Sequence, residues 1–340
     1  MEFRLIRPAW QYNYYRPRVS VLQRLSIRFS SSNASPFKSY LVTPKELSAA
    51  LSESTKDSKS RIIPLCASWF LPNDPQGRTG LKVFEQKRIP NAVFFDIDVV
   101  KDDSSSYPHM LPTAEGFASA MSGLGLKKTD RVVVYDSAEL GIFSAPRAAW
   151  TLKVFGHSNV HVLNNFKIWI EDGYPTESGK IKETEEKTTY PVPSINPDRV
   201  ACFRDVKSAA KDHGKEGADK FQVLDARSPG RFSGRDPEPR PGLSSGHIPG
   251  SINLPLQEIL DPTNKAFLPA EELRKVFEKA GLDPETPIIT SCGTGVMACA
   301  LDAALGEAKF GEEAFRRVYD GSWTEYAQRA KEDGMIAKDI

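Results

Sequence analysis

Short apolar segments alternate with segments of helical periodicity along most of this chain. Apolar runs at 61–66, 93–96 and 132–135 predict strands, and the periodicity of 114–124 and 144–154 predicts helices. Strands that alternate with helices favour a largely parallel sheet, because parallel neighbours need a long crossover connection between them. We therefore expect an α/β fold with helices on both faces of the sheet.

A segment of different composition interrupts this alternation, which then begins again. Residues 176–200 are rich in charge and proline and poor in apolar side chains, so they predict a linker on the surface. Beyond the linker, 221–225 and 287–290 predict strands again. We therefore expect two domains, one over 42–175 and the other over 201–330, each with a mostly parallel sheet.

Short similarities between the two halves recur at nearly constant spacing. Ile89 and Ile248 lie in similar turns 159 positions apart, and Asp136 and Cys292 follow similar strands 156 positions apart. A fixed period of this kind indicates a repeat. We interpret the two expected domains as copies of one fold.

The first 35 residues differ from the rest of the chain in their charge. They hold six arginines, no lysine and one acidic residue, and they end in serines. An arginine-rich, serine-containing and acid-poor leader is typical of mitochondrial transit peptides. A basic arm for nucleic acid is the rival interpretation, but apolar residues interleave the arginines and argue against it. We expect residues 1–35 to direct the protein to the mitochondrial matrix.

The composition of the whole chain excludes several classes of protein. With 45 basic and 44 acidic side chains, the net charge gives no argument for nucleic-acid binding. No apolar stretch reaches the length of a membrane-spanning helix. The cysteines are too few for a disulfide scaffold and lack the paired spacing of a zinc site: Cys66, Cys202, Cys292 and Cys299. We therefore expect no metal, no membrane and no direct nucleic-acid partner.

The strongest functional signal is the segment that begins at Cys292. An apolar strand leads into it, Gly293 and Gly295 follow, and an alanine-rich helix at 298–308 leaves it. Glycines permit a tight arc whose amide N–H groups point inward, next to the positive end of a helix. Such an arc favours a negatively charged sulfur, whether a thiolate or a persulfide. The alternative is an inert, buried cysteine, which is our interpretation of Cys299.

Two other kinds of cysteine chemistry do not fit this segment. A cysteine phosphatase needs an arginine six residues after the cysteine, and Ala298 stands there. The loop also holds no charged side chain, whereas a phosphate dianion favours a guanidinium partner. A thioredoxin-like redox site needs a second cysteine three residues further on, where this chain has Gly295.

Four separate blocks of this sequence occur in the same order in one enzyme family. They are Leu224–Arg240, Gly246–Gly250, Cys292–Val296 and Tyr319–Tyr326. On these blocks the chain resembles the tandem rhodanese-domain sulfurtransferases over about residues 42–330, and most closely the branch that uses 3-mercaptopyruvate. The resemblance implies two rhodanese-like domains, of which the C-terminal one is catalytic and the N-terminal one is not. It makes Cys292 the nucleophile, with Asp136 near the matching position of the other domain.

The composition of the loop also bears on the sulfur donor. Family members that prefer thiosulfate resemble Cys-Arg-Lys-Gly-Val here, whereas this chain has uncharged Gly293 and Thr294. Mercaptopyruvate carries its charge on a carboxylate away from the sulfur, so its cations should lie further from the nucleophile. Arg231 and Arg240 match the family's substrate-binding arginines, and a guanidinium suits a carboxylate. From the residues alone, two arginines in a proline-containing loop favour solvated surface charge.

The N-terminal half is expected to contribute to the same site. The resemblance implies a relay in which Asp98 orients His109, and His109 polarises the hydroxyl of Thr294. An imidazole held by a carboxylate can assist proton transfer at a neighbouring hydroxyl. From the residues alone, His109 is interpreted as a loop histidine bonded to the backbone.

The loop that would hold the persulfide departs from the family at one position. It comprises Gly293, Gly295, Val296 and Met297, next to Cys292. Family members usually carry threonine or another small polar residue in place of Met297. A hydroxyl that could bond the persulfide is therefore missing, so Met297 either changes persulfide stability or simply packs.

The expected reaction is a two-step sulfur transfer that needs no cofactor. Cys292 takes the sulfane sulfur of 3-mercaptopyruvate as a persulfide, pyruvate leaves, and a thiol or cyanide accepts the sulfur. We expect thioredoxin or a small thiol as the acceptor, and a monomeric enzyme. Two alternatives stay open: a thiosulfate:cyanide sulfurtransferase that uses the same cysteine, and a persulfide relay protein for tRNA thiolation or cofactor sulfuration.

Overall fold

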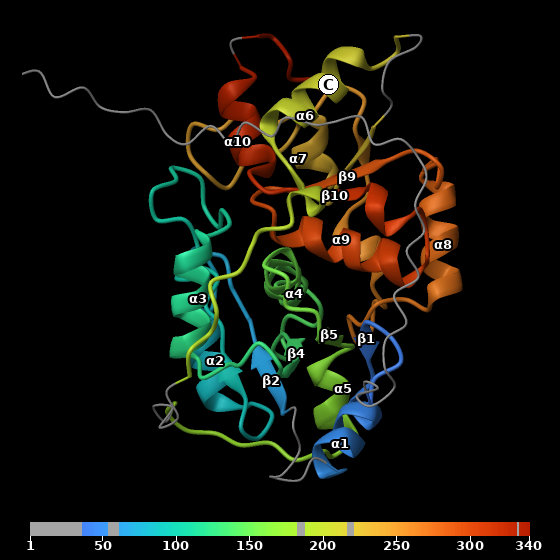
Figure 1. Cartoon of the computed structure of the whole chain (residues 1–340). Coiled ribbons are helices and arrows are strands. Elements are labelled where there is room, and N and C mark those ends of the chain that lie inside the picture. The colour runs from blue at the N-terminus through green and yellow to red at the C-terminus, as the bar shows by residue number, and fades with distance from the viewer. Residues whose placement is uncertain (1–35, 54–60, 182–187, 216–220, 332) are drawn as a thin grey trace, which may run out of the picture. The chain divides into compact units, whose positions relative to one another are not determined.

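The computed structural model describes residues 36–53, 61–181, 188–215, 221–331 and 333–340. The segment interpreted as a transit peptide, residues 1–35, lies outside the described residues. The described residues form two five-stranded sheets with helices around them (Figure 1). Within these ranges, no helix is long and apolar enough to cross a membrane.

The first sheet is built from the first half of the chain, and all its strand pairs are parallel. Its strands are β1 (Leu41–Val42), β2 (Ile62–Cys66), β3 (Val93–Phe94), β4 (Arg131–Tyr135) and β5 (Val160–Leu163). Their order across the sheet is β1-β5-β4-β2-β3. All three apolar runs predicted as strands in this half are strands, although β3 is shorter than expected.

The second sheet repeats this arrangement with residues of the second half. Its strands are β6 (Val200–Ala201), β7 (Gln222–Asp225), β8 (Ile252–Asn253), β9 (Ile288–Ser291) and β10 (Arg316–Tyr319). They are again all parallel, in the order β6-β10-β9-β7-β8, which matches the first sheet strand for strand. Strands β5 and β10 lie 156 positions apart, which is the spacing found in the sequence. The predicted α/β fold with two mostly parallel sheets is confirmed.

Little regular structure lies between the two sheets along the chain. In the described part of 176–200, Glu177 forms an isolated antiparallel bridge with Arg88. A 3₁₀ turn, η1 (Pro197–Arg199), then leads directly into β6. The domain boundaries 42–175 and 201–330 stay predictions. The edge strands β1 and β6 begin one residue before the first residues of these two ranges.

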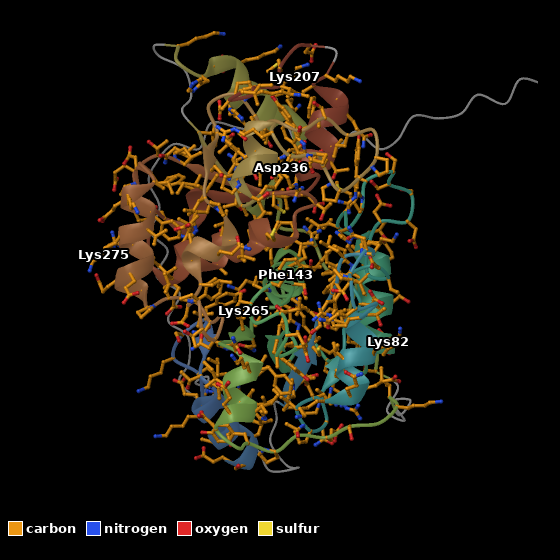
Figure 2. The ribbon with its side chains drawn as sticks, turned by 180° about the vertical axis from the view of Figure 1, so that it is seen from behind. Lys82, Phe143, Lys207, Asp236, Lys265 and Lys275 are labelled. Carbon is orange, nitrogen blue, oxygen red and sulfur yellow. The ribbon has the colours of Figure 1, made fainter. Side chains whose placement is uncertain are left out.

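Helices cover both sheets. In the first half they are α1 (Pro44–Glu53), α2 (Gly80–Gln86), α3 (Ala114–Gly123), α4 (Ala145–Val154) and α5 (Phe166–Glu171). In the second half they are α6 (Phe203–Asp212), α7 (Pro229–Ser233), α8 (Ala270–Lys279), α9 (Val296–Glu307) and α10 (Ser322–Arg329), with 3₁₀ turns η2 (Leu256–Ile259) and η3 (Glu313–Phe315). Lys82, Lys207 and Lys275 point outward from α2, α6 and α8 (Figure 2).

The sheets are buried on both faces, as parallel sheets usually are. In β4, Val132 and Val134 belong to one hydrophobic cluster, while Val133 and Tyr135 belong to another. Successive side chains of a strand point to opposite faces, so two separate clusters must lie on the two sides of the sheet. A run of apolar residues without alternation is therefore what this fold requires of its central strands.

The two halves meet where α4 packs against α9, between the two sheets (Figure 1). Helix α9 is apolar on nearly all sides, which is typical of a helix inside the protein. Next to this contact, the N–H of Ile142 donates to the carbonyl oxygen of Lys265 at 3.2 Å, and Lys265 Nζ donates to the carbonyl oxygen of Glu139 at 2.9 Å. Figure 2 shows Phe143 and Lys265 in this region. Helix packing and backbone hydrogen bonds therefore join the two halves here.

Candidate active site

Cys292 lies between the end of β9 and the start of α9. The chain turns into the helix at Gly295, whose φ of 76° is in the left-handed region. A Cβ atom there would lie 2.7 Å from the carbonyl oxygen of Asp320 and 2.9 Å from Nη1 of Arg147. Both the backbone and the neighbours therefore require glycine, which explains the tight arc expected from the sequence.

The first turn of α10 holds the beginning of this arc. The N–H of Cys292 donates to Ser322 Oγ at 3.1 Å, and the N–H of Trp323 donates to the carbonyl oxygen of Cys292 at 2.9 Å. The carbonyl oxygen of Gly293 accepts from the amide of Thr324 at 3.0 Å and from its hydroxyl at 2.8 Å. These bonds fix the arc through the amide of Cys292 and through the carbonyl oxygens of Cys292 and Gly293.

The next three amides of the arc behave differently. Among the described residues, nothing accepts a hydrogen bond from the N–H groups of Gly293, Thr294 and Gly295. Buried backbone donors are almost always bonded, and the amino end of a helix adds partial positive charge. Next to Cys292, which is only 1% exposed, the arc thus offers three donors to a bound anion.

Two other buried cysteines lack such surroundings. The Sγ atom of Cys66 lies 3.2 Å from Ser68 Oγ, and burial raises the pKa of its thiol to about 12. Cys299 donates to the carbonyl oxygen of Gly295 at 3.2 Å, and burial raises its pKa well above the usual range. Both are buried among packed side chains, and for Cys299 this agrees with the interpretation from the sequence. In the described ranges, no group of three His, Cys, Asp or Glu side chains is placed to hold a metal ion.

The three residues expected to form a relay lie together. Thr294 Oγ1 is 3.1 Å from His109 Nδ1, and His109 Nε2 is 2.9 Å from Asp98 Oδ1. Burial lowers the pKa of His109, while the hydrogen bond from His109 lowers the pKa of Asp98. A neutral imidazole between a hydroxyl and a carboxylate donates through Nε2 and accepts at Nδ1. The hydroxyl of Thr294 therefore donates its proton toward His109.

The relay has a further member that the sequence did not reveal. Trp69 Nε1 donates to the second carboxylate oxygen of Asp98 at 2.7 Å, and its ring meets the His109 ring edge-on, with centroids 4.8 Å apart. The side chain of Asp98 is 56% exposed, so the hydrogen bonds from Trp69 and His109 are what fix the position of its carboxylate. A single tryptophan after a strand has no sequence pattern that would have singled it out.

A buried ion pair between the halves fixes the backbone of His109. His109 has a left-handed φ of 61°, and its carbonyl oxygen accepts from Arg147 of α4. Arg147 also pairs with Asp320, at 2.7 Å, which follows β10. The other oxygen of Asp320 accepts from the N–H of Leu111 at 2.9 Å. Sequence reasoning missed this pair because its members are remote along the chain and neither lies in a motif of its own.

Arg231, the first of the two predicted substrate arginines, is already paired. It donates to Glu238 at 2.5 Å and 3.2 Å, and Glu238 also accepts from Arg227 at 2.8 Å. Arg227 in turn pairs with Asp225 at 2.6 Å. The Nη2 atom of Arg231 lies 3.2 Å from the place of a Cβ on Gly293, so this guanidinium is next to the arc.

Arg240, the second predicted substrate arginine, has no acidic partner within the part of the chain that is described. Burial and the neighbouring Arg231 guanidinium lower the pKa of Arg240, and the charges that act on it include Cys292 and Asp98. A cavity of about 500 Å³ lies beside it. The other residues that line this cavity include Lys101, Tyr107, Thr324 and Gln328. Arg240 is therefore an open cation close to both the cysteine and the relay.

The last two residues of the predicted loop pack into the protein. Val296 is 2% exposed, and Met297 is partly buried against the central hydrophobic cluster. The structure thus places Met297 in a packing environment, as one of the two sequence expectations had it.

Comparisons with known proteins agree with this site. The model of the rhodanese-like domain matches residues 206–329, which contain Cys292 and both arginines. A Schizosaccharomyces pombe protein named "Probable 3-mercaptopyruvate sulfurtransferase" is 42% identical over 83% of this chain and 91% of its own length. The Arabidopsis thaliana "Thiosulfate/3-mercaptopyruvate sulfurtransferase 1, mitochondrial" is 41% identical over 77% of this chain and 71% of its own length. The crystal structure of Tum1 from Saccharomyces cerevisiae matches with a TM-score of 0.79 and 39% identity, over 88% of this chain and 98% of that one.

The chain therefore belongs to the tandem rhodanese-domain sulfurtransferases, and each half of it, with its five-stranded sheet, has the rhodanese fold. It is an enzyme that transfers sulfur. The relatives it resembles are named for 3-mercaptopyruvate, thiosulfate or both, and they include a mitochondrial form. The resemblance stated from the motifs is confirmed.

Proposed function

We propose that Cys292 takes sulfur from 3-mercaptopyruvate and carries it as a persulfide. One observation carries the proposal: the three amides that follow Cys292 have no acceptor among the residues described. A persulfide places a negative charge on its outer sulfur, and preorganised amide donors stabilise a charge that develops during a reaction. Among the described residues, the arc gathers three such donors next to the cysteine.

The donor is held by its carboxylate. Arg240 is open, half-buried and electrostatically coupled to Cys292, so it is the main partner of that carboxylate. Arg231 contributes beside it, with its guanidinium orientation set by Glu238. The arc itself carries no cation, which suits a donor whose charge is remote from its sulfur more than it suits thiosulfate.

The first step forms a sulfur–sulfur bond and breaks a carbon–sulfur bond. The Cys292 thiolate supplies the electron pair of the new bond, and the electron pair of the carbon–sulfur bond leaves with the enolate of pyruvate. The proton of the donor thiol balances the step, because the enolate takes up one proton to become pyruvate. The donor carbonyl becomes the enolate oxygen, so it needs a hydrogen-bond donor.

The relay can carry the proton that this step moves. Thr294 is adjacent to the cysteine in the arc, and its hydroxyl bonds to a neutral His109 at 3.1 Å. The hydroxyl oxygen takes the proton of the donor thiol as its own proton passes to His109, Asp98 stabilises the imidazolium, and the same path returns the proton to the enolate. In this proposal the N-terminal domain carries no nucleophile of its own and serves the catalytic C-terminal domain by holding His109.

In the second step a thiol attacks the outer sulfur and releases Cys292. The attacking thiolate forms the new sulfur–sulfur bond, and the Cys292 thiolate is the leaving group. The cavity of about 500 Å³ beside Arg240 is larger than a three-carbon acid requires, so we expect a small thiol, or an exposed protein thiol such as that of thioredoxin, to approach from there. Residues 1–35 would place the reaction in the mitochondrial matrix.

Mass spectrometry of the intact chain tests the proposal. After exposure to 3-mercaptopyruvate and removal of excess donor, the protein should carry one additional sulfur atom, located on the peptide that contains Cys292. Cys292→Ser should carry none, whereas the control Cys299→Ser should load like the parent. Loading by thiosulfate alone would indicate a thiosulfate:cyanide sulfurtransferase. Loading without turnover toward small acceptors would indicate a persulfide relay, and no loading at all would disprove the proposal.

A further inference from the structure

A second cavity, of about 300 Å³, lies along α9 at the contact between the two halves. Cys299, Asp302, Ala303 and Gly306 line it from α9, at the three- and four-residue spacings of one helix face. Tyr40, Trp150 and Lys153 line it from the first half of the chain. It shares no lining residue with the cavity beside Arg240, so it is separate from the substrate site.

The charges around this cavity are unbalanced. Two arginines are already satisfied, since Arg199 pairs with Glu313 and Arg316 with Asp302, at 3.3 Å in the second case. The remaining charged residues of the lining are Lys153 and Lys309.

Neither lysine pairs with an acid within the described ranges. The ammonium of Lys153 lies 3.7 Å from the centre of the Tyr40 ring, and burial lowers its pKa. Lys153 is half-buried and has no ion-pair partner of its own, although Asp302 and Glu313 also act on it, so an anion in the cavity would be favoured. Lys153 and Lys309 together match an anion that carries two negative charges.

The indole N–H group of Trp150, a residue that lines the cavity, supports this interpretation. Four tryptophans lie in the described residues, and three donate to an acceptor: Trp69 to Asp98, Trp169 to Pro175 and Trp323 to Ser244. Trp150 donates to none in the same ranges, although it is only 3% exposed. Buried tryptophans usually find a partner for this group, so the cavity is where the missing acceptor belongs.

We propose that the cavity between Trp150, Lys153 and Lys309 is a binding site for a small dianion, either a phosphate compound or a dicarboxylate. The ligand accepts from the indole N–H of Trp150 and pairs with the two lysines, while the Tyr40 ring covers its apolar side. Binding adds contacts between α9 and the first half of the chain, so it stabilises the folded protein by mass action.

Nuclear magnetic resonance of the tryptophan indole groups tests this proposal. The full chain, labelled with ¹⁵N at tryptophan, is titrated with inorganic phosphate and, in a second arm, with malonate, at ionic strength held constant with chloride. The Trp150 signal, assigned through Trp150→Phe, should move saturably in at least one arm, and the tighter arm identifies the ligand class. The Trp323 signal should stay in place, because its N–H is already bonded to Ser244.

Variants locate the binding charge. Lys153→Gln should weaken binding at least tenfold and Lys309→Gln less, because Lys309 is exposed. Lys153→Arg keeps the charge and should keep most of the affinity. The control Lys167→Gln removes a surface lysine on α5 and should bind like the parent. A Trp150 signal that stays in place in both arms, or moves linearly without saturation, or moves equally in Lys153→Gln, would overturn the proposal.

Discussion

The loops after β4 and β9 occupy the same place in their two sheets, yet they satisfy their amides in opposite ways. After β4, the carboxylate of Asp136 accepts from the amides of Phe143, Ser144 and Ala145 at 2.7, 2.9 and 2.8 Å. It also accepts from the hydroxyl of Ser144 at 2.6 Å. The amino end of α4 is thus closed by a negative charge that belongs to the protein.

After β9, the residue in the place of Asp136 is Cys292, and the three amides that follow it have no acceptor among the described residues. The first loop shows what the second one lacks, because the same fold places an anion at the amino end of a helix in both. In one half that anion is built in. In the other half, we infer, it is delivered with the substrate sulfur.

The largest effect is expected from giving the catalytic loop the residue of its counterpart. Cys292→Asp removes the nucleophile, so sulfur transfer should fall to the background rate. The new carboxylate can accept from the open amides, so the thermal midpoint should equal or exceed that of Cys292→Ser. Activity assays and melting curves on the two variants check this. A lower midpoint for Cys292→Asp than for Cys292→Ser would show that the amides do not face position 292.

A change in the loop after β4 should affect stability rather than catalysis. Asp136→Asn replaces a carboxylate oxygen by an NH₂ group that faces N–H donors, which should cost about 2–3 kcal/mol of unfolding free energy. Urea denaturation monitored by circular dichroism measures the loss, and kcat of the folded variant should stay near that of the parent. Asp103→Asn, on an exposed loop, is the control and should be neutral. Lost turnover with unchanged stability would contradict the structural role of Asp136.

Beside the second loop, Arg240 is a cation with no acidic partner in the described ranges, so it should matter to substrate binding. Arg240→Leu should lower kcat/KM for 3-mercaptopyruvate by about 10- to 100-fold, mostly through KM, which corresponds to about 1.5–3 kcal/mol for one charged hydrogen bond. Steady-state kinetics measure this, with Arg235→Leu as the matched control on the same exposed segment. An unchanged KM would remove Arg240 from the substrate site.

The smallest effect on stability concerns the histidine that the first half lends to the second. Burial lowers the pKa of His109 below its ordinary value near 6.5, so the folded protein keeps it neutral where the unfolded chain binds a proton. From pH 6.5 downward to the folded pKa, the unfolded state therefore binds more protons, and stability is lost as the pH falls.

His109→Asn removes this contribution. Its unfolding free energy should fall less steeply below pH 6.5 than that of the parent, which a series of denaturation curves measures. Parallel pH profiles for the two proteins would mean that His109 is not kept neutral by burial. The same variant should reduce kcat at neutral pH by about 10²-fold, as expected for the loss of an acid–base group.

The elements that could be predicted from the sequence are those whose hydrophobic pattern or composition is continuous over several residues. Strand β4 contains an unbroken apolar run because both of its faces are buried, and the glycine arc after Cys292 is conspicuous for its composition. The edge strands β1 and β6 have two residues each, which is too short for any periodicity to show. The relay residues could be named only through the family resemblance, since nothing in the sequence joins His109 to Thr294.

The residues that sequence reasoning missed have in common that they act in pairs across long separations. Arg147 and Asp320 form one buried ion pair from the two halves, and Trp69 reaches Asp98 from another loop. Glu238 is closer in the sequence to Arg227 and Arg231, but its role also depends on the two hydrogen bonds that it accepts from them. A single side chain of this kind carries no local signal, because its role exists only once the fold has brought its partner near.

The bond between Thr294 and His109 joins residues 185 positions apart. A polypeptide that contained only the second sheet would still possess the arc after β9, but it would lack the imidazole of His109, the indole of Trp69 and the guanidinium of Arg147. The half that carries Asp136 in its loop thus holds the groups that orient Thr294 in the half that carries Cys292. Severing the chain between the sheets should therefore yield two fragments that are inert apart and regain turnover only when mixed.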